Sequence, residues 1–296
     1  MKFGSVEQPE LVDFTLPDDH HDTESVLKKG GELKSVFVGC AKWNKQDLKK
    51  FYPRGTKDEL AYYSTQFNSI ELNATFYNHF KQEQIEKWVE KTPDDFKFFP
   101  KVHQMVSHIK RLNEVEEPID RYTSNIRTLG DKLGMCFLQL HDNFKPKNMD
   151  RLVTAVELWP KDIPLAIELR NTEWFNDAEV ANEVYSLFEN HNISNIITDT
   201  AGRRDLLHMR LTSPSVFVRY VGANHESDYA RLDVWMNRIK SWVDMGMENL
   251  YFFVHQNLEK ESPVLSAYLI EKLNKELGLS LTVPVGVDGT KDGKLF

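Results

Sequence analysis

Eight short apolar runs recur along this chain, and each closes on a charged or hydrogen-bonding residue. Helix-like stretches separate most of the runs, so that the pattern is a strand followed by a helix, repeated eight times. This alternation predicts a single eight-stranded parallel β/α barrel, a TIM barrel of the α/β class. The expected strands are Ser35–Trp43, Ser69–Tyr77, Phe96–Val102, Gly134–His141, Pro164–Asn171, Ile193–Thr200, Val216–Gly222 and Asn249–Asn257.

The length fits one domain. The chain has 296 residues, 41% of them hydrophobic, which suffices for one barrel core of about 250 residues and an extension. We expect a polar N-terminal extension over residues 1–34 that packs against or trails from the barrel. The barrel is expected over residues 35–287 and a C-terminal tail over residues 288–296.

The composition limits the partners that the protein is expected to bind and the cell compartment in which it is expected. No apolar run reaches the ~20 residues that span a membrane, and the N-terminus lacks the basic start and apolar core of a secretory signal. Cys40 and Cys136 lie in expected strands outside any CxxC pair, which indicates reduced core thiols and a cytoplasmic location. A nucleophilic Cys40 is the alternative. The net charge of -8 argues against broad, non-specific nucleic-acid binding, although a small basic pocket stays open.

The connections between the strands carry helix signals, with one exception. The capping box Thr56-x-x-Glu59 predicts the first helix, and Gln82–Lys91 is the expected second helix. The segment Ala201–Ser215, between the sixth and seventh strands, is short and ends in Ser-Pro-Ser. Any helix there should be small.

Polar residues gather at the carboxyl ends of the expected strands, where barrels place their chemistry. In the run Glu71–Tyr77 the odd positions are polar and the even positions apolar. Helices cover the outside of a parallel barrel, so the polar set should face inward. The same parity gives an inward polar ring: Glu71, Asn73, Tyr77, Lys101, Gln139, His141, Glu168, Arg170, Asp199, Arg219 and His255.

The ring has two readings. Buried carboxylates are costly unless they are paired, and Lys101, Arg170 and Arg219 could offset Glu71, Glu168 and Asp199. The ring is therefore either a functional pocket or an internal salt-bridge network that fills the barrel. Trp174, directly after the fifth strand, could wall such a pocket.

Beyond these patterns, the chain after residue 34 resembles the YecE-like family, catalogued as domain of unknown function 72. The resemblance is carried by GCAKW around Gly39 and Trp43, by the run ELNATFY that starts at Glu71, and by TPDDF at 92–96. Glu168-Leu169-Arg170 with Trp174 adds to it. The resemblance implies an eight-stranded β/α barrel and no particular activity.

The chain departs from the sequence pattern usual in that family at four places on the barrel rim. Ala41-Lys42 replaces Ser-Gly, and His141-Asp142 replaces Pro-Pro. Asn171 replaces a histidine, and His255-Gln256-Asn257 stands where the eighth strand usually closes on paired asparagines. The resemblance therefore implies a divergent branch, whose ligand need not be that of its relatives.

We interpret the ring as a metal-free site for a small anionic ligand, a phosphate or a carboxylate. Arg170 and Arg219 offer planar forks, and Lys101 adds a point charge. Glu71 or Glu168 would act as general base or acid, with His141 or His255 as a partner that titrates near neutral pH. The expected ligand-binding residues are Asn73, Tyr77, Lys101, Gln139, Arg170, Trp174, Asp199 and Arg219; no metal ligand and no cofactor is assigned.

Other functions remain open at this point, including whether the chain is an enzyme. A metal-dependent hydrolase or isomerase would use the carboxylates with His141 or His255, but no HxH or HExxH spacing supports it. A glycosidase is disfavoured, because Gln139 and Arg219 stand where common barrel glycosidases carry their acid and nucleophile.

The last alternative is a barrel that binds a ligand or a nucleic-acid fragment without turning it over. Nucleic acid is neither excluded nor favoured. Basic and aromatic residues, which together can hold single-stranded nucleic acid, are interleaved in the segment after the first expected β-strand. They are Lys42, Trp43, Lys45, Lys49, Lys50, Phe51, Tyr52 and Arg54. The oligomeric state is left open.

Overall fold

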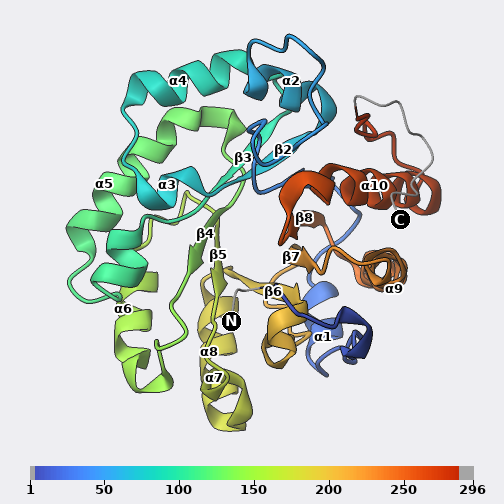
Figure 1. Cartoon of the computed structure of the whole chain (residues 1–296). Helices are drawn as coiled ribbons and strands as arrows, with labels where there is room; N and C mark the ends of the chain where they lie inside the picture. Colours follow the sequence, from blue (N-terminus) through green and yellow to red (C-terminus); the bar gives the residue numbers. More distant parts are fainter. Residues whose placement is uncertain (1–3, 287–296) are drawn as a thin grey trace.

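The computed structural model describes residues 4–286 and consists of eight parallel strands surrounded by helices (Figure 1). The predicted β/α barrel is confirmed. Each expected run contains one strand, although most strands end earlier than the apolar pattern suggested. The strands are β1 (Ser35–Cys40), β2 (Ser69–Leu72), β3 (Lys97–Pro100), β4 (Cys136–Gln139), β5 (Leu165–Glu168), β6 (Ser194–Thr200), β7 (Ser215–Gly222) and β8 (Asn249–Gln256).

The barrel is nearly closed between β3 and β4. The sheet runs in the order β3-β2-β1-β8-β7-β6-β5-β4, so these two strands are its edges. Two isolated parallel bridges join them, one pairing Phe98 with Leu133 and the other pairing Lys101 with Phe137. Gly134 permits this approach, because a Cβ at this position would lie 2.7 Å from the ring of Phe99.

Helices cover the outer face of the sheet. They are α1 (Thr23–Leu27), α2 (Glu59–Gln66), α3 (Ala74–Tyr77), α4 (Gln82–Lys91), α5 (Glu116–Ile126), α6 (Met149–Leu158), α7 (Glu173–Asn176), α8 (Ala178–Asn190), α9 (Ser227–Met245) and α10 (Ser262–Leu277). Among residues 4–286, none of them is long and apolar enough to cross a lipid bilayer. The expected second helix has the bounds of α4.

The predicted capping box at the start of α2 is wrong. Asp58, and not Thr56, precedes the first helical residue, and its carboxylate accepts a hydrogen bond from the backbone N–H of Ala61 (3.1 Å). Thr56 instead lies in the preceding turn, where its hydroxyl donates to the carbonyl of Pro53. Thr56 and Asp58 are both good capping residues, but Asp58 directly precedes the first helical residue, Glu59, and is therefore the N-cap.

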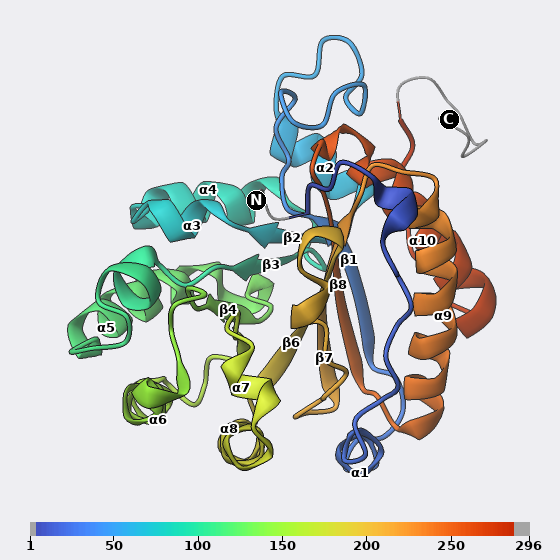
Figure 2. The same cartoon turned by 60° about the horizontal axis from the view of Figure 1, so that its bottom comes forward.

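The connection between β6 and β7 is short, as predicted, and forms only the 3-10 helix η5 (Ala201–Leu206). The described part of the N-terminal extension covers this side of the barrel, and α1 lies between α8 and α9 (Figure 2). Its Leu16 and Leu27 are buried in the same apolar cluster as Trp235 and Trp242 of α9. Residues 4–34 therefore pack where a sixth barrel helix would otherwise stand. The expected C-terminal tail, 288–296, lies outside the described residues.

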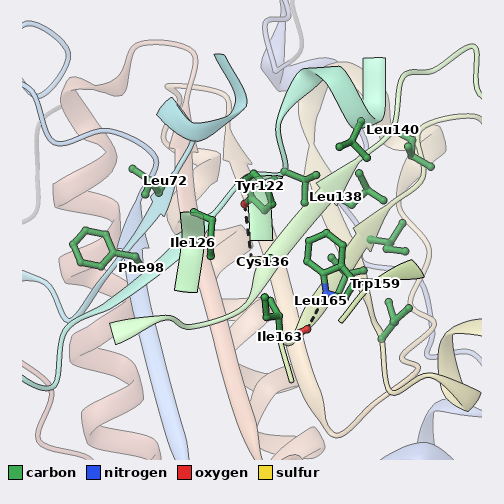
Figure 3. Packing of buried hydrophobic residues seen from close by; sticks show 14 of the residues in the cluster. Leu72, Phe98, Tyr122, Ile126, Cys136, Leu138, Leu140, Trp159, Ile163 and Leu165 are labelled. Atoms are coloured by element: carbon green, nitrogen blue, oxygen red, sulfur yellow. Dashed lines mark hydrogen bonds between the residues drawn. The ribbon is translucent and has the colours of Figure 1, made fainter. Parts of the chain in front are cut away.

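An apolar layer fills the barrel interior. Its buried members are Phe99, Met135, Phe137, Ala166, Ile196, Phe217 and Phe253. Larger apolar clusters lie outside the sheet, under the helices. Figure 3 shows part of one of them. In it Tyr122 of α5 donates to the sulfur of Cys136 (3.9 Å), and the indole of Trp159 donates to the carbonyl of Ile163 (2.9 Å).

Both cysteines are free and buried. Burial raises the pKa of Cys136 to about 12 and also raises the pKa of Cys40. A thiol with a raised pKa carries little thiolate and is a poor nucleophile. The expectation of core thiols is confirmed, and the nucleophilic reading of Cys40 finds no support in this environment.

Candidate functional site

A polar layer lies two residues beyond the apolar layer, at the carboxyl end of the barrel. Side chains two positions apart on a strand share a face. Each inward residue of the apolar layer is therefore followed, two positions along its strand, by an inward residue of the polar layer. Phe99 is followed by Lys101, Phe137 by Gln139, Ala166 by Glu168, Phe217 by Arg219 and Phe253 by His255. Glu71 joins this layer from β2. We call these six residues together with Arg170 the mouth cluster.

Arg219 lies at the centre of the mouth cluster. Its Nε and Nη2 donate to the two carboxylate oxygens of Glu71, both at 2.9 Å, which is the bidentate geometry of a strong ion pair. Its Nη1 donates to Oε2 of Glu168 at 2.6 Å. Arg170 binds the other oxygen of Glu168 through Nε at 2.5 Å. Two buried carboxylates are thus held by two guanidinium groups.

Both carboxylates are ionised. Burial on its own raises the pKa of Glu71, but Arg219 and His255 outweigh burial and hold this pKa well below its usual range. Burial likewise opposes ionisation of Glu168, and Arg170 and Arg219 together lower its pKa. At neutral pH Glu71 and Glu168 therefore have no proton to donate, and they are weak bases.

Lys101 loses its proton close to neutral pH. Burial, and then the nearby charges of Arg219 and Arg170, lower the pKa of Lys101 to about 7. Its amine donates to Oε1 of Gln139 (2.7 Å), and Nε2 of Gln139 in turn donates to Glu168 (2.9 Å). The amine also lies 4.3 Å from the ring centre of Phe76. A neutral amide and an aromatic ring are thus its neighbours, where a buried lysine usually has a carboxylate.

His255 links Glu71 to a further carboxylate, that of the partly buried Glu259. Its Nε2 lies 2.8 Å from Oε2 of Glu71, and its Nδ1 lies 4.0 Å from Oε1 of Glu259. Burial raises the pKa of Glu259, although the hydroxyl of Ser262 donates to it at 2.6 Å. Sequence reasoning missed Glu259. Glu259 lies past the end of β8, at the start of η6 (Glu259–Glu261), where strand parity gives no signal.

His108 was not among the predicted site residues, although it borders the cluster. It lies in the π-helical turn Met105–Ile109, with its ring against Phe76 (4.8 Å between centres) and 5.5 Å from that of His141. Burial, and then the charge of Lys101, lower the pKa of His108 to about 4. His108 is therefore neutral at pH 7.

Two further predicted residues lie at the edge of the cluster. Asn73 donates from Nδ2 to Oε1 of Glu71 (2.8 Å) and so orients that carboxylate. His141 lies on the rim, 45% of its side chain is exposed, and its Nδ1 contacts Asp142 (2.6 Å). His141 is thus separate from the buried ion pairs.

Three predicted site residues, two members of the ring and Trp174, lie outside the mouth cluster. Strand β2 ends at Leu72 and the next residues form α3, so parity no longer applies at Tyr77, which is 64% exposed. Trp174 is buried in α7 and donates to the carbonyl of Phe144 (2.7 Å). Asp199 faces outward and accepts from Arg231 (2.9 Å) and Trp235 (2.7 Å) of α9, because β6 turns Ile196 and not Ile197 into the barrel.

The basic and aromatic segment after β1 packs most of its aromatic rings against other parts of the protein. Phe51 and Tyr52 are buried in the apolar core. Trp43 packs on Trp88, with 5.9 Å between ring centres. Two of the three aromatic rings are thus engaged inside the protein, whereas Trp43 is partly exposed and meets Trp88 edge-on.

The mouth cluster does not gather a set of metal ligands. Among residues 4–286, the trio of histidine and carboxylate side chains with ligand atoms within 4.8 Å of one another is His20, His21 and Asp22, in the N-terminal extension. In the mouth, Glu71 and Glu168 contact arginine, whose positive charge opposes a cation at the same oxygens.

Comparison with known proteins agrees with this architecture. The family model described as protein of unknown function DUF72 matches residues 37–285. The UPF0759 protein YecE of Escherichia coli strain K12 is 24% identical over 264 residues, which are 82% of this chain and 94% of that protein. The UPF0759 protein YunF of Bacillus subtilis is 31% identical over 153 residues, which are 48% of this chain and 52% of that protein.

Solved structures support the same fold. A DUF72 family protein of Thermotoga maritima superimposes with a TM-score of 0.66 at 24% identity, over 81% of this chain and 99% of that one. A DUF72 family protein of Enterococcus faecalis gives a TM-score of 0.65 at 18% identity, over 83% and 99% of the two chains. Since the family model matches most of its length, the chain belongs to the DUF72 family of proteins of unknown function.

Proposed function

We propose that the barrel mouth binds a small anionic molecule, a carboxylate or a phosphate, and moves protons on it by metal-free acid/base chemistry. The observation that carries this proposal is the environment of Lys101. With its amine protonated, Lys101, Arg170 and Arg219 supply three positive charges, and Glu71 and Glu168 supply two negative ones, which leaves one positive charge in excess. A bound anion would neutralise this excess.

The contacts divide the work among the residues differently from the sequence-based expectation. Arg219 already directs Nε, Nη1 and Nη2 at the two carboxylates, so Lys101 and Arg170 are the cations that would meet the anion. Arg170 is the more accessible of the two, with 21% of its side chain exposed to solvent. Glu71 and Glu168 hold these cations in place.

In this proposal Lys101 and His255 transfer the protons. The pKa of Lys101 is about 7, which suits proton transfer at neutral pH. His255 contacts Glu71 on one side and is 12% exposed, so a proton can pass between it and a ligand in the opening. A cytoplasmic location is also part of the proposal, supported by the two free thiols.

Titration calorimetry with inorganic phosphate and with small carboxylates tests the binding. We expect affinity to fall as pH rises through about 7, since the ammonium form of Lys101 holds the anion. In buffers of different ionisation enthalpy, binding near pH 7.5 should be accompanied by proton uptake. Lys101→Met and Arg170→Gln should each weaken binding by about tenfold or more, a loss expected for hydrogen bonds between charged groups.

Lys161→Met is the matched control, because Lys161 is exposed and lies at the opposite end of the barrel, ahead of β5. Its binding should equal that of the unchanged protein. The proposal fails if none of the anions binds, or if Lys101→Met and Lys161→Met bind equally well.

A further inference from the structure

We propose that Lys101 is also a nucleophile, which forms an imine with a carbonyl group of the bound molecule. The substrate class is then an aldehyde or ketone that carries a carboxylate or phosphate. This inference rests on the proposed function, because the anion is what brings the carbonyl group to the mouth.

The first argument is a comparison of two buried lysines. Lys132 donates to the carbonyls of Val89 (2.7 Å) and Thr92 (2.6 Å) and to the hydroxyl of Thr92 (3.3 Å), so its ammonium is fully hydrogen-bonded. Within residues 4–286, the side-chain amine of Lys101 donates only to Gln139. The environment of Lys132 satisfies an ammonium, whereas that of Lys101 leaves one poorly solvated.

The second argument is the surface that the amine faces. Phe76 lies 4.3 Å and Phe137 6.0 Å from the Lys101 amine, measured to the ring centres. Gln139 fixes the direction of the amine, and it is itself held by Glu168. Desolvation and neighbouring cations are the means by which proteins keep a lysine neutral and nucleophilic. The pKa of about 7 agrees with this geometry.

The reaction balances without an oxidant or reductant. The lone pair of the neutral amine attacks the carbonyl carbon, a C–N bond forms, and one amine hydrogen passes to the carbonyl oxygen. The second amine hydrogen then leaves with this oxygen as water, which gives the C=N bond. His108, whose ring contacts that of Phe76 beside Lys101, is neutral at pH 7 and suited to relay these protons.

The test is to trap the imine by reduction. The whole protein is incubated with pyruvate or with dihydroxyacetone phosphate and treated with sodium borohydride, and the adduct is located by mass spectrometry of peptides. We expect one adduct per chain, on Lys101. With the probe at saturating concentration it should form faster at pH 8 than at pH 6, because Arg170 still holds the anion while the amine must be neutral to attack. Lys161→Met should give the same adduct.

Lys101→Arg separates this inference from the proposed function. The arginine keeps the positive charge but cannot form an imine, so this variant should still bind phosphate and give no adduct. If the unchanged protein binds phosphate but neither carbonyl probe is trapped on Lys101, the imine is wrong and the anion site stands. If phosphate does not bind either, both proposals fail.

A second measurement does not depend on ligand recognition. Limiting formaldehyde with cyanoborohydride at pH 7 methylates amines in proportion to their neutral, accessible fraction. Lys101 should react at least tenfold faster than exposed lysines such as Lys161. Equal or slower methylation of Lys101 in folded protein would overturn the inference.

Discussion

At the scale of single residues, Arg219 decides whether two carboxylates can stay ionised inside the barrel. It contacts both Glu71 and Glu168, and all three side chains are buried. We predict that Arg219→Met lowers the free energy of unfolding in urea at pH 7 by about 3 to 5 kcal/mol, because it leaves buried carboxylates without a full complement of cations. Arg54→Met, at an exposed arginine, should change it by less than about 0.5 kcal/mol.

The difference in unfolding free energy between the Arg219→Met variant and the unchanged protein should depend on pH, and the direction of the carboxylate pKa shifts determines how. The pKa values of Glu71 and Glu168 are lowered in the folded protein. Their contribution to stability is therefore fully present above the unfolded-state pKa of about 4.3 and is lost as pH falls through the folded-state values. The gap between the Arg219→Met variant and the unchanged protein should therefore narrow as the pH is lowered below about 4.3, towards the lowered folded-state values. A gap that is constant with pH would contradict the ion-pair explanation.

The sequence predicted which side chains face into the barrel mouth only where a strand has one apolar face and one polar face. Parity placed Glu71, Lys101 and Arg219 correctly, because side chains alternate strictly within a strand. It failed at Asp199, since β6 carries Ile196 and Ile197 on opposite faces and either parity looks buried. It also failed at Tyr77, because the chain had already left the strand for α3.

At the scale of elements, Asp199 explains how α9 is attached to the barrel. Its carboxylate accepts from Arg231 and Trp235, and Arg231 also binds Asp228 (2.9 Å). Arg204 of η5 contacts the same carboxylate and also donates to the carbonyl of Thr15 in the N-terminal extension (3.0 Å). This single carboxylate on β6 therefore connects β6, η5 and α9, and through Arg204 the extension.

We predict that Asp199→Asn destabilises the fold by about 3 kcal/mol or more in urea unfolding, because the buried Arg231 loses a charged partner. Phosphate binding by the folded variant should be unchanged, since Asp199 faces α9 and not the mouth. Asp150→Asn, at an exposed aspartate, serves as the control for the stability measurement. Loss of binding in a folded Asp199→Asn protein would show that the outer network shapes the site.

At the scale of the whole molecule, the period of the apolar runs predicted the barrel and also its irregular sixth connection. The pattern could not show what covers that connection. The N-terminal extension is mostly polar, and contacts that fix it join residues as far as 186 and 223 positions apart. Examples are the hydrogen bonds from Thr23 to Met209 (2.9 Å) and from Trp242 to Asp19 (3.0 Å). Such long-range contacts leave no local period in a sequence.

If residues 4–34 replace a barrel helix, they should contribute to the stability of the whole domain. Removing residues 1–29 uncovers the apolar surface that Leu16, Val26 and Leu27 bury, at about 1.5 to 3 kcal/mol for each side chain. The entropy of the removed segment offsets part of this, so we predict a net loss on the order of 3 kcal/mol in urea unfolding. Asp19→Asn, which keeps the apolar cover, should lose less. Unchanged stability of the shortened chain would mean that the sheet and helices of the barrel need no cover at β6, and that the extension lies on the barrel without supporting it.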